Sequence, residues 1–167
     1  MRVQRSLSLA WLLLVTGAFL GSTAATASDE EVGTGFHYGT KEHPFEGERY
    51  QTMRALALSL DERAQHAASQ SIDDAHQGRK DERKFVDAVT RFAEQARDFH
   101  RRMDNYQDDP WDVPDEVEHL NDDAHNVSDR IRKARVFEHT WQDWDGVLDV
   151  LRQMNRVIAG HDVETTF

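Results

Sequence analysis

The sequence predicts an all-α protein that folds as an antiparallel up-down-up-down four-helix bundle with a flexible N-terminal arm. Apolar residues recur at alternating steps of three and four through four successive segments. No segment shows the apolar–polar alternation of a β-strand, and short links containing Pro or Gly separate the segments. Short links place consecutive helices antiparallel, so the bundle is expected over residues 44–160.

The first two helices have narrow apolar seams. The first is expected to begin at Pro44 and end near Gly78, and the second to end before Pro110. The first seam comprises Tyr50, Met53, Ala57, Leu60, Ala64, Ala67, Ser71 and Ala75; the second comprises Phe85, Val89, Phe92, Ala96, Phe99, Met103 and Tyr106. This spacing is typical of helices that bury one face against neighbours.

Capping residues set the expected starts of the last two helices. Asp112 is the expected N-cap of the third helix, and Thr140 with Asp143 resembles a capping arrangement for the fourth. The third seam comprises Val117, Leu120, Ala124, Val127, Ile131 and Ala134; the fourth helix is expected to bury Trp141, Trp144, Leu148, Leu151 and Ile158 and to end at Gly160. Asn155 falls within this last seam, where a buried amide commonly fixes register or oligomeric state.

The first 27 residues have the features of a secretory signal peptide. Two arginines precede an apolar stretch from Leu7 to Leu20, and small residues follow at 25–27. That stretch is shorter than the roughly 20 residues that span a bilayer, so we expect cleavage after Ala27 and no transmembrane segment in the mature form. The expected location is periplasmic or secreted. Residues 28–43 are expected to form a flexible acidic, Gly-rich arm, and 161–167 a C-terminal tail.

Composition excludes several function classes. The chain of 167 residues has no cysteine, which excludes disulfides, cysteine-based metal sites and thiol nucleophiles. Its formal net charge of −11 argues against nucleic-acid binding, which depends on neutralising phosphates. G-x-S-x-G, H-E-x-x-H and glycine-rich phosphate loops are absent. The leading hypothesis is an exported non-enzymatic bundle that binds an envelope protein partner or a second copy of itself.

The alternative hypothesis is a periplasmic metal- or haem-binding bundle. The chain has nine histidines, and His100 lies near the second seam, one turn before Met103. Antiparallel packing places Met53 in about the same layer as Met103, and Glu116 lies near the third seam. Such a set would suit a divalent or soft metal ion, or a haem iron held by Met and His. The competing interpretation is that methionines at seam positions only fill the core.

Three carboxylate-x-x-His pairs resemble the spacing used in di-iron bundles. They are Asp73 with His76, Glu116 with His119, and Asp122 with His125. Helical stepping places these histidines, together with His66, on the water-facing side of their helices. We therefore expect no di-iron centre.

Charge is expected to separate along the bundle. One end, here the acidic end, carries Asp104, Asp108, Asp109, Asp112, Asp115, Glu116, Glu118, Asp122 and Asp123; the other, the basic end, carries Arg79, Lys80, Arg83, Lys84, Arg130, Arg132, Lys133 and Arg135. The acidic end could hold a cation or a cationic partner, and the basic end could contact an anionic surface. The alternative is that the charges of the third helix only match its dipole.

Overall fold

A computed structural model describes residues 37–75, 79–134 and 138–161. Four helices account for most of this part: α1 (Gly47–Asp74), α2 (Lys80–Asp104), α3 (Val113–Ala134) and α4 (Glu138–Ile158). The expected signal peptide, residues 28–36 of the expected arm and residues 162–167 of the tail lie outside the described residues.

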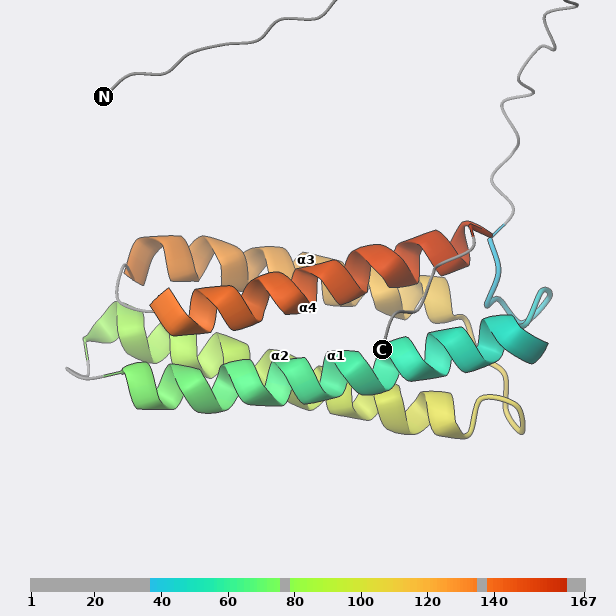
Figure 1. The fold of residues 1–167 in the computed structure, drawn as a ribbon, viewed down its shortest axis with the longest axis horizontal. Coiled ribbons are helices and arrows are strands. Elements are labelled where there is room, and N and C mark those ends of the chain that lie inside the picture. Colours follow the sequence, from blue (N-terminus) through green and yellow to red (C-terminus); the bar gives the residue numbers. More distant parts are fainter. Residues whose placement is uncertain (1–36, 76–78, 135–137, 162–167) are drawn as a thin grey trace, which may run out of the picture. The chain divides into compact units, whose positions relative to one another are not determined.

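The four helices form the predicted bundle. Each helix packs against two neighbours, α1 against α2 and α4, and α3 against α2 and α4, so the four close into a ring (Figure 1). The last turns of α1 and α3 and the first turns of α2 and α4 lie at one end of the bundle, and the α2–α3 connection lies at the other, which makes sequential helices antiparallel. No strand occurs in the described ranges. None of the described helices combines the length and apolar character needed to cross a membrane.

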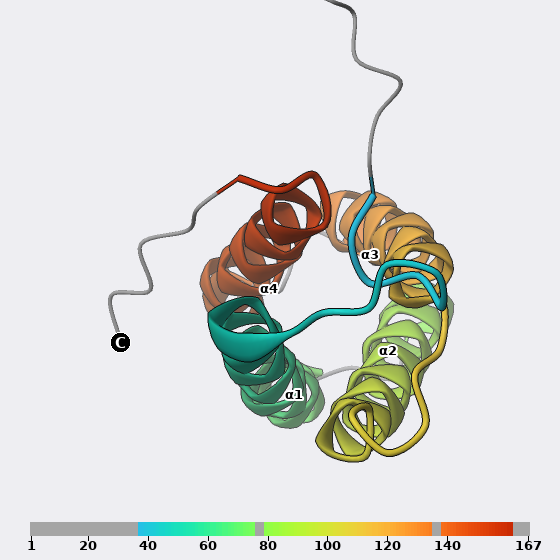
Figure 2. The same ribbon diagram turned by 90° about the vertical axis from the view of Figure 1, so that its right-hand side faces the viewer.

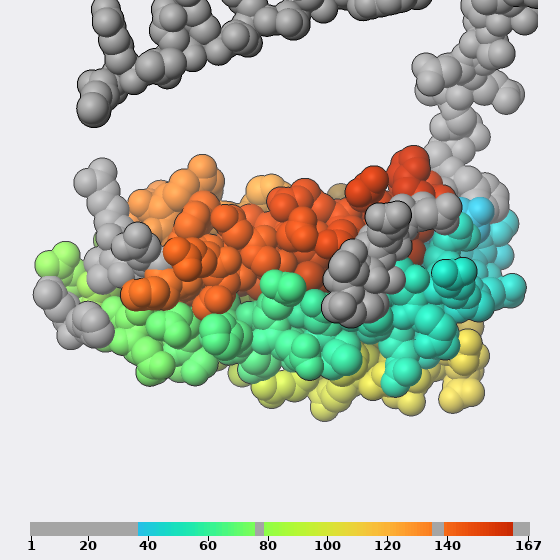
Figure 3. All heavy atoms as spheres, in the orientation of Figure 1, coloured from blue at the N-terminus to red at the C-terminus, as the bar shows by residue number. Residues whose placement is uncertain are grey.

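One hydrophobic core runs along the inside of the ring. The largest side chains buried in it are Trp144, Tyr106, Phe85, Phe92, Phe99, Met53, Leu60, Met103, Leu120, Leu151 and Met154. Figure 3 shows the coloured atoms of α1 and α4 side by side on one face of the bundle. The seams predicted for α1, α2 and α3 are buried at nearly all their positions, as expected for the apolar faces of bundle helices.

The predicted face of α4 is partly wrong. Trp144, Leu151 and Ile158 are buried as expected, but Trp141 is 37% exposed and Asn155 is exposed. The core also takes up residues outside the predicted set, namely Val147, Val150, Met154 and Val157. This helix is apolar around much of its circumference, so two overlapping stripes compete and periodicity alone does not choose between them.

The segment 37–46 differs from the expected arm and helix start. It lies across the acidic end of the bundle, seen end-on in Figure 2. Backbone hydrogen bonds connect the Tyr38 N–H to the Ile158 carbonyl (2.9 Å) and the Val113 N–H to the Gly39 carbonyl (2.9 Å). Phe45 is 2% exposed, and its N–H donates to the Tyr106 hydroxyl (3.2 Å). The first helix begins at Gly47 and not at Pro44 as predicted, and Phe45 lies in the buried part of the segment that precedes it.

At the basic end a tertiary contact replaces the expected local cap. Both the N–H and the hydroxyl of Thr140 donate to the Asp74 carboxylate, at 3.4 and 3.0 Å. Asp143, the partner expected from sequence, instead contacts His66 on α1 (3.0 Å). The last residue of α1 therefore satisfies donors in the first turn of α4, which holds these two helix ends together.

Candidate functional site

The residues predicted as metal ligands do not share one environment. Met53 and Met103 have no exposed surface and belong to the hydrophobic core. The His100 side chain is 19% exposed, as expected for a position at the edge of the seam, and the Glu116 side chain is 38% exposed. A ligand at the two buried thioethers would have to displace core packing.

His100 forms part of a polar network between α1 and α2. Its Nδ1 lies 3.1 Å from Asp61 on α1, and its Nε2 lies 3.7 Å from Asp104 one turn further along α2. Asp104 also accepts a hydrogen bond from Arg54 (2.7 Å), which raises the pKa of that guanidinium. Both imidazole nitrogens therefore face carboxylates of this protein, and the network joins α1 to α2 at the edge of the core.

Glu116 has a different partner. Its carboxylate accepts a hydrogen bond from Arg102 (3.0 Å), whose guanidinium carbon lies 3.8 Å from the centroid of the Trp111 ring. Glu116 and His100 therefore engage separate partners. The described residues contain no group of three or more His, Cys, Asp or Glu side chains arranged to hold a metal ion. Metal binding through His100, Met103, Met53 and Glu116 stays a prediction.

The other histidine prediction is confirmed wherever the structure describes it. His66, His119 and His125 are all exposed, so the Glu116–His119 and Asp122–His125 pairs do not project together into the bundle. His76 lies outside the described residues. The inward pairs that a di-iron bundle requires are therefore missing from the described helices.

The acidic end is partly neutralised by residues from other helices. Arg54 reaches Asp104 from α1, Arg102 reaches Glu116 from α2, and the Lys41 N–H donates to Asp112 (3.0 Å). An aromatic cluster lies beneath these charges, formed by Phe45, Tyr50, Phe99, Tyr106 and Trp111 with ring centroids about 6 Å apart. The acidic end is thus a packed closure of the bundle.

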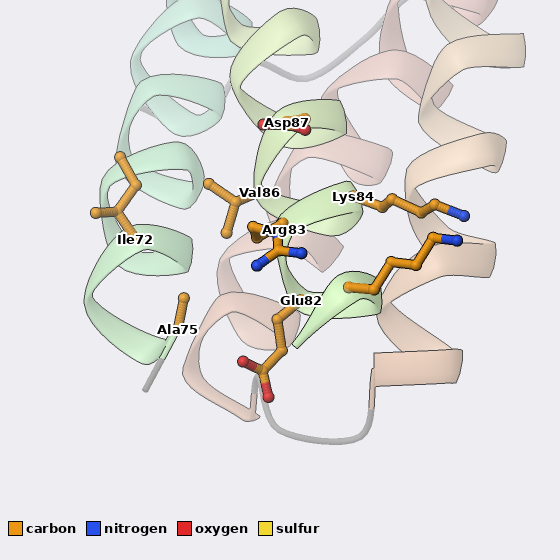
Figure 4. A pocket seen from close by; sticks show the side chains of 8 residues that line it. Ile72, Ala75, Glu82, Arg83, Lys84, Val86 and Asp87 are labelled. Carbon is orange, nitrogen blue, oxygen red and sulfur yellow. The ribbon is translucent and has the colours of Figure 1, made fainter. Parts of the chain in front are cut away.

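The basic end has a hollow of about 470 Å³ between α1 and α2. Ile72 and Ala75 line it from α1, and Val86 lines it from α2 (Figure 4). Ile72 is 59% exposed, more than either of the other exposed large apolar residues of the described part, Leu58 and Trp141. The remaining lining is charged: Lys80, Glu82, Arg83, Lys84 and Asp87. An apolar side chain thus lies in solvent beside a group of cations.

A second hollow of about 240 Å³ lies between α2 and α3. It is lined by Asp81, Lys84, Asn126, Asp129, Arg130 and Lys133. Lys84 lines both hollows, which lie on either side of the first turns of α2. We call Ile72, Lys80, Arg83, Lys84, Arg130 and Lys133 together the basic surface.

The cations of this surface were predicted from the sequence, but Ile72 was not. The signal was present, since Ile72 directly follows the seam residue Ser71 and therefore lies about 100° away from the seam. The partners of His100 were not predicted either. The antiparallel register of α1 and α2 brings Asp61 to His100, and it brings Arg54 to Asp104, the second carboxylate beside His100. Comparison with protein-family models, with curated proteins and with solved structures finds no match to this chain.

Proposed function

We propose that this protein is an exported, non-enzymatic binding module that engages an anionic partner through its basic surface. The observation that carries the proposal is the position of Lys80, Arg83 and Lys84 in the first two turns of α2. Lys80 lies in the first turn, where positive charge opposes the helix dipole and costs about 0.3–1 kcal/mol; the effect falls off beyond that turn. The helix dipole therefore does not account for Lys80, and the exposed Lys84 forms no ion pair among the described residues that would account for it.

The helix dipole distinguishes the cations of α3 from those of α2. Arg132 and Lys133 lie in the last turn of α3, where the dipole favours cations, so that helix needs no further explanation. The α2 cations lack this explanation, and they are exposed. Binding to a negatively charged partner supplies a reason for their placement.

Neighbouring acids only partly offset these cations. Glu82 is 2% exposed and accepts a hydrogen bond from the Arg79 N–H (3.2 Å), and Asp129 is paired with Arg132. Asp81 and Asp87 are the exposed acids on this part of α2. The cations of both hollows therefore outnumber the acids that face solvent beside them.

Photo-cross-linking in the cells that make the protein tests this proposal. A photoreactive amino acid at position 126, in the second hollow, is compared with one at position 118, at the acidic end. We expect an adduct with the anionic partner, either a protein or a phospholipid, from position 126 only. Reversing three charges of the basic surface, with Lys80→Glu, Lys84→Glu and Lys133→Glu together, should abolish the adduct.

A matched variant controls for total charge. Arg91→Glu, Arg97→Glu and Arg156→Glu change the net charge equally at exposed positions away from the basic surface and should keep the adduct. Adducts of equal yield from position 118, or an adduct that survives reversal of the basic surface, would contradict the proposal. Turnover of a hydrolase or redox substrate by the purified protein, abolished by a substitution in the bundle, would contradict its non-enzymatic part.

A further inference from the structure

We infer that the anionic partner of the basic surface is the surface of a phospholipid membrane, which the bundle contacts end-on with Ile72 entering the interfacial layer. This inference rests on the proposed function and names the partner. It follows from how the apolar and cationic side chains are arranged around the start of α2.

The side chains do not converge on one small ligand. Figure 4 shows Ile72 on α1 and Val86 on the side of α2 nearer to α1, whereas the Lys84 side chain extends from the opposite side of α2. Arg130 and Lys133 lie further around the end, on α3. Cations spread over the ends of two helices, beside an exposed apolar side chain on a third, suit an extended anionic surface better than a single anionic group.

The exposed apolar side chains favour a lipid surface over a second copy of this chain. Three large apolar residues of the described part are exposed, and two of them lie towards the basic end: Ile72 near the end of α1 and Trp141 in the first turn of α4. None lies at the acidic end, which is the complementary charged surface that a second copy would offer. Head-to-tail pairing would therefore place Ile72 against charged groups, whereas a membrane interface accepts Ile, Trp and basic side chains together.

Net charge makes the contact orientation-specific. The chain carries a formal charge of −11, and unpaired acids such as Asp109, Asp115 and Glu118 lie between α2 and α3 or in the first turns of α3, at the other end of the bundle from the basic surface. An anionic membrane therefore repels the rest of the molecule and attracts only its basic end. Attraction that depends on a few exposed cations falls steeply as salt rises.

Co-sedimentation with vesicles tests the inference. The purified protein is mixed at low ionic strength with vesicles of phosphatidylglycerol and phosphatidylcholine, or of phosphatidylcholine alone. We expect binding only to the vesicles that contain phosphatidylglycerol, with loss of binding in high salt. Each cation near an anionic leaflet contributes about fivefold, so Lys80→Glu, Lys84→Glu and Lys133→Glu together should weaken binding at least about a hundredfold.

A second pair of variants tests the apolar contact. Ile72→Ser should weaken binding to phosphatidylglycerol vesicles about tenfold, because the inserted side chain is lost. Leu58→Ser is the matched control: it removes an exposed apolar residue of the same helix, 43% exposed but outside the basic surface, and should leave binding unchanged. Circular dichroism confirms that each variant is folded.

Equal binding by the reversal variant and its Arg91, Arg97 and Arg156 control would overturn the inference, as would equal effects of Ile72→Ser and Leu58→Ser. Failure to bind phosphatidylglycerol vesicles would also overturn it. The proposed function would survive that result if the cross-link from position 126 to a protein still depended on the basic surface. If the protein neither bound these vesicles nor formed a cross-link that depends on the basic surface, the proposed function would be contradicted as well.

Discussion

The two ends of the bundle are closed in different ways. At the acidic end, the segment 37–46 and a cluster of aromatic rings cover the core, and Arg54 and Arg102 neutralise two of the acids. At the basic end, Asp74 and Thr140 join α1 to α4, while Ile72 and the α2 cations lie in solvent. Arg54, Arg102 and the two acids that they pair with therefore have structural roles that the sequence does not show. Lys80 and Lys84 at the start of α2 are exposed and form no ion pair among the described residues, which is why we assign binding to them.

Removing an aromatic ring should show this difference most strongly. Tyr106 is fully buried, its hydroxyl accepts from Phe45, and its ring lies 6.0 Å from that of Tyr50. We expect Tyr106→Ala to cost about 3–5 kcal/mol in the free energy of unfolding, measured with urea. Trp141→Ala at the basic end should cost less than about 1 kcal/mol. Similar losses from both would contradict the comparison.

Glycine substitutions test the covering segment separately. Gly39 and Gly47 both have positive φ, at 87° and 51°, but a Cβ at Gly39 would collide with the Phe45 ring whereas one at Gly47 would meet nothing. Gly39→Ala should therefore destabilise the protein by about 1–3 kcal/mol more than Gly47→Ala. Equal unfolding free energies for the two variants would show that the segment 37–46 is not held against the bundle.

At the basic end, Asp74→Ala should cost about 1–2 kcal/mol at neutral pH, because two donors of Thr140 lose their acceptor. The exposed neighbour gives a control, Asp73→Ala, which should cost less than about 0.5 kcal/mol. Urea unfolding of both variants against the unsubstituted protein measures the difference.

The Asp74 contribution should also depend on pH. Partial burial raises the pKa of Asp74, but hydrogen bonds from Thr140 and Gln70 and the nearby His139 outweigh it, so its pKa lies below the ordinary value of 3.8. A carboxyl whose pKa is lowered by folding stabilises the protein above its unfolded pKa and loses that contribution as pH falls through its folded pKa. The stability difference between the unsubstituted protein and Asp74→Ala should therefore shrink below about pH 4. A difference that grows on acidification would contradict this account.

The smallest expected effect concerns the His100 network. A double-mutant cycle with His100→Ala and Asp61→Ala should give a coupling free energy of about 0.5–1 kcal/mol, since both side chains are less than one-fifth exposed. The matched cycle on His66 and Asp143, where the imidazole is 68% exposed, should give less than about 0.5 kcal/mol. Equal couplings would show that burial does not distinguish the two pairs.

The sequence by itself determined the fold class, the order of the helices, three of the four buried faces and the positions of the charges. It could do so because helix periodicity and short links are local properties, and the seams of α1, α2 and α3 each leave one low-energy face for the core. It also determined that His66, His119 and His125 face solvent, because that follows from their angle to the seam.

Tertiary structure alone decided which face α4 buries, where the segment 37–46 lies and which partner each charge meets. Trp141 and Asn155 were misplaced because α4 is apolar on more than one side, so its neighbours choose the buried face. Asp74 reaches Thr140 across 66 positions of sequence, and Arg54 reaches Asp104 across 50. Such pairs depend on the register between packed helices, which no local pattern contains, and that register also leaves the cations at the start of α2 beside an exposed Ile72.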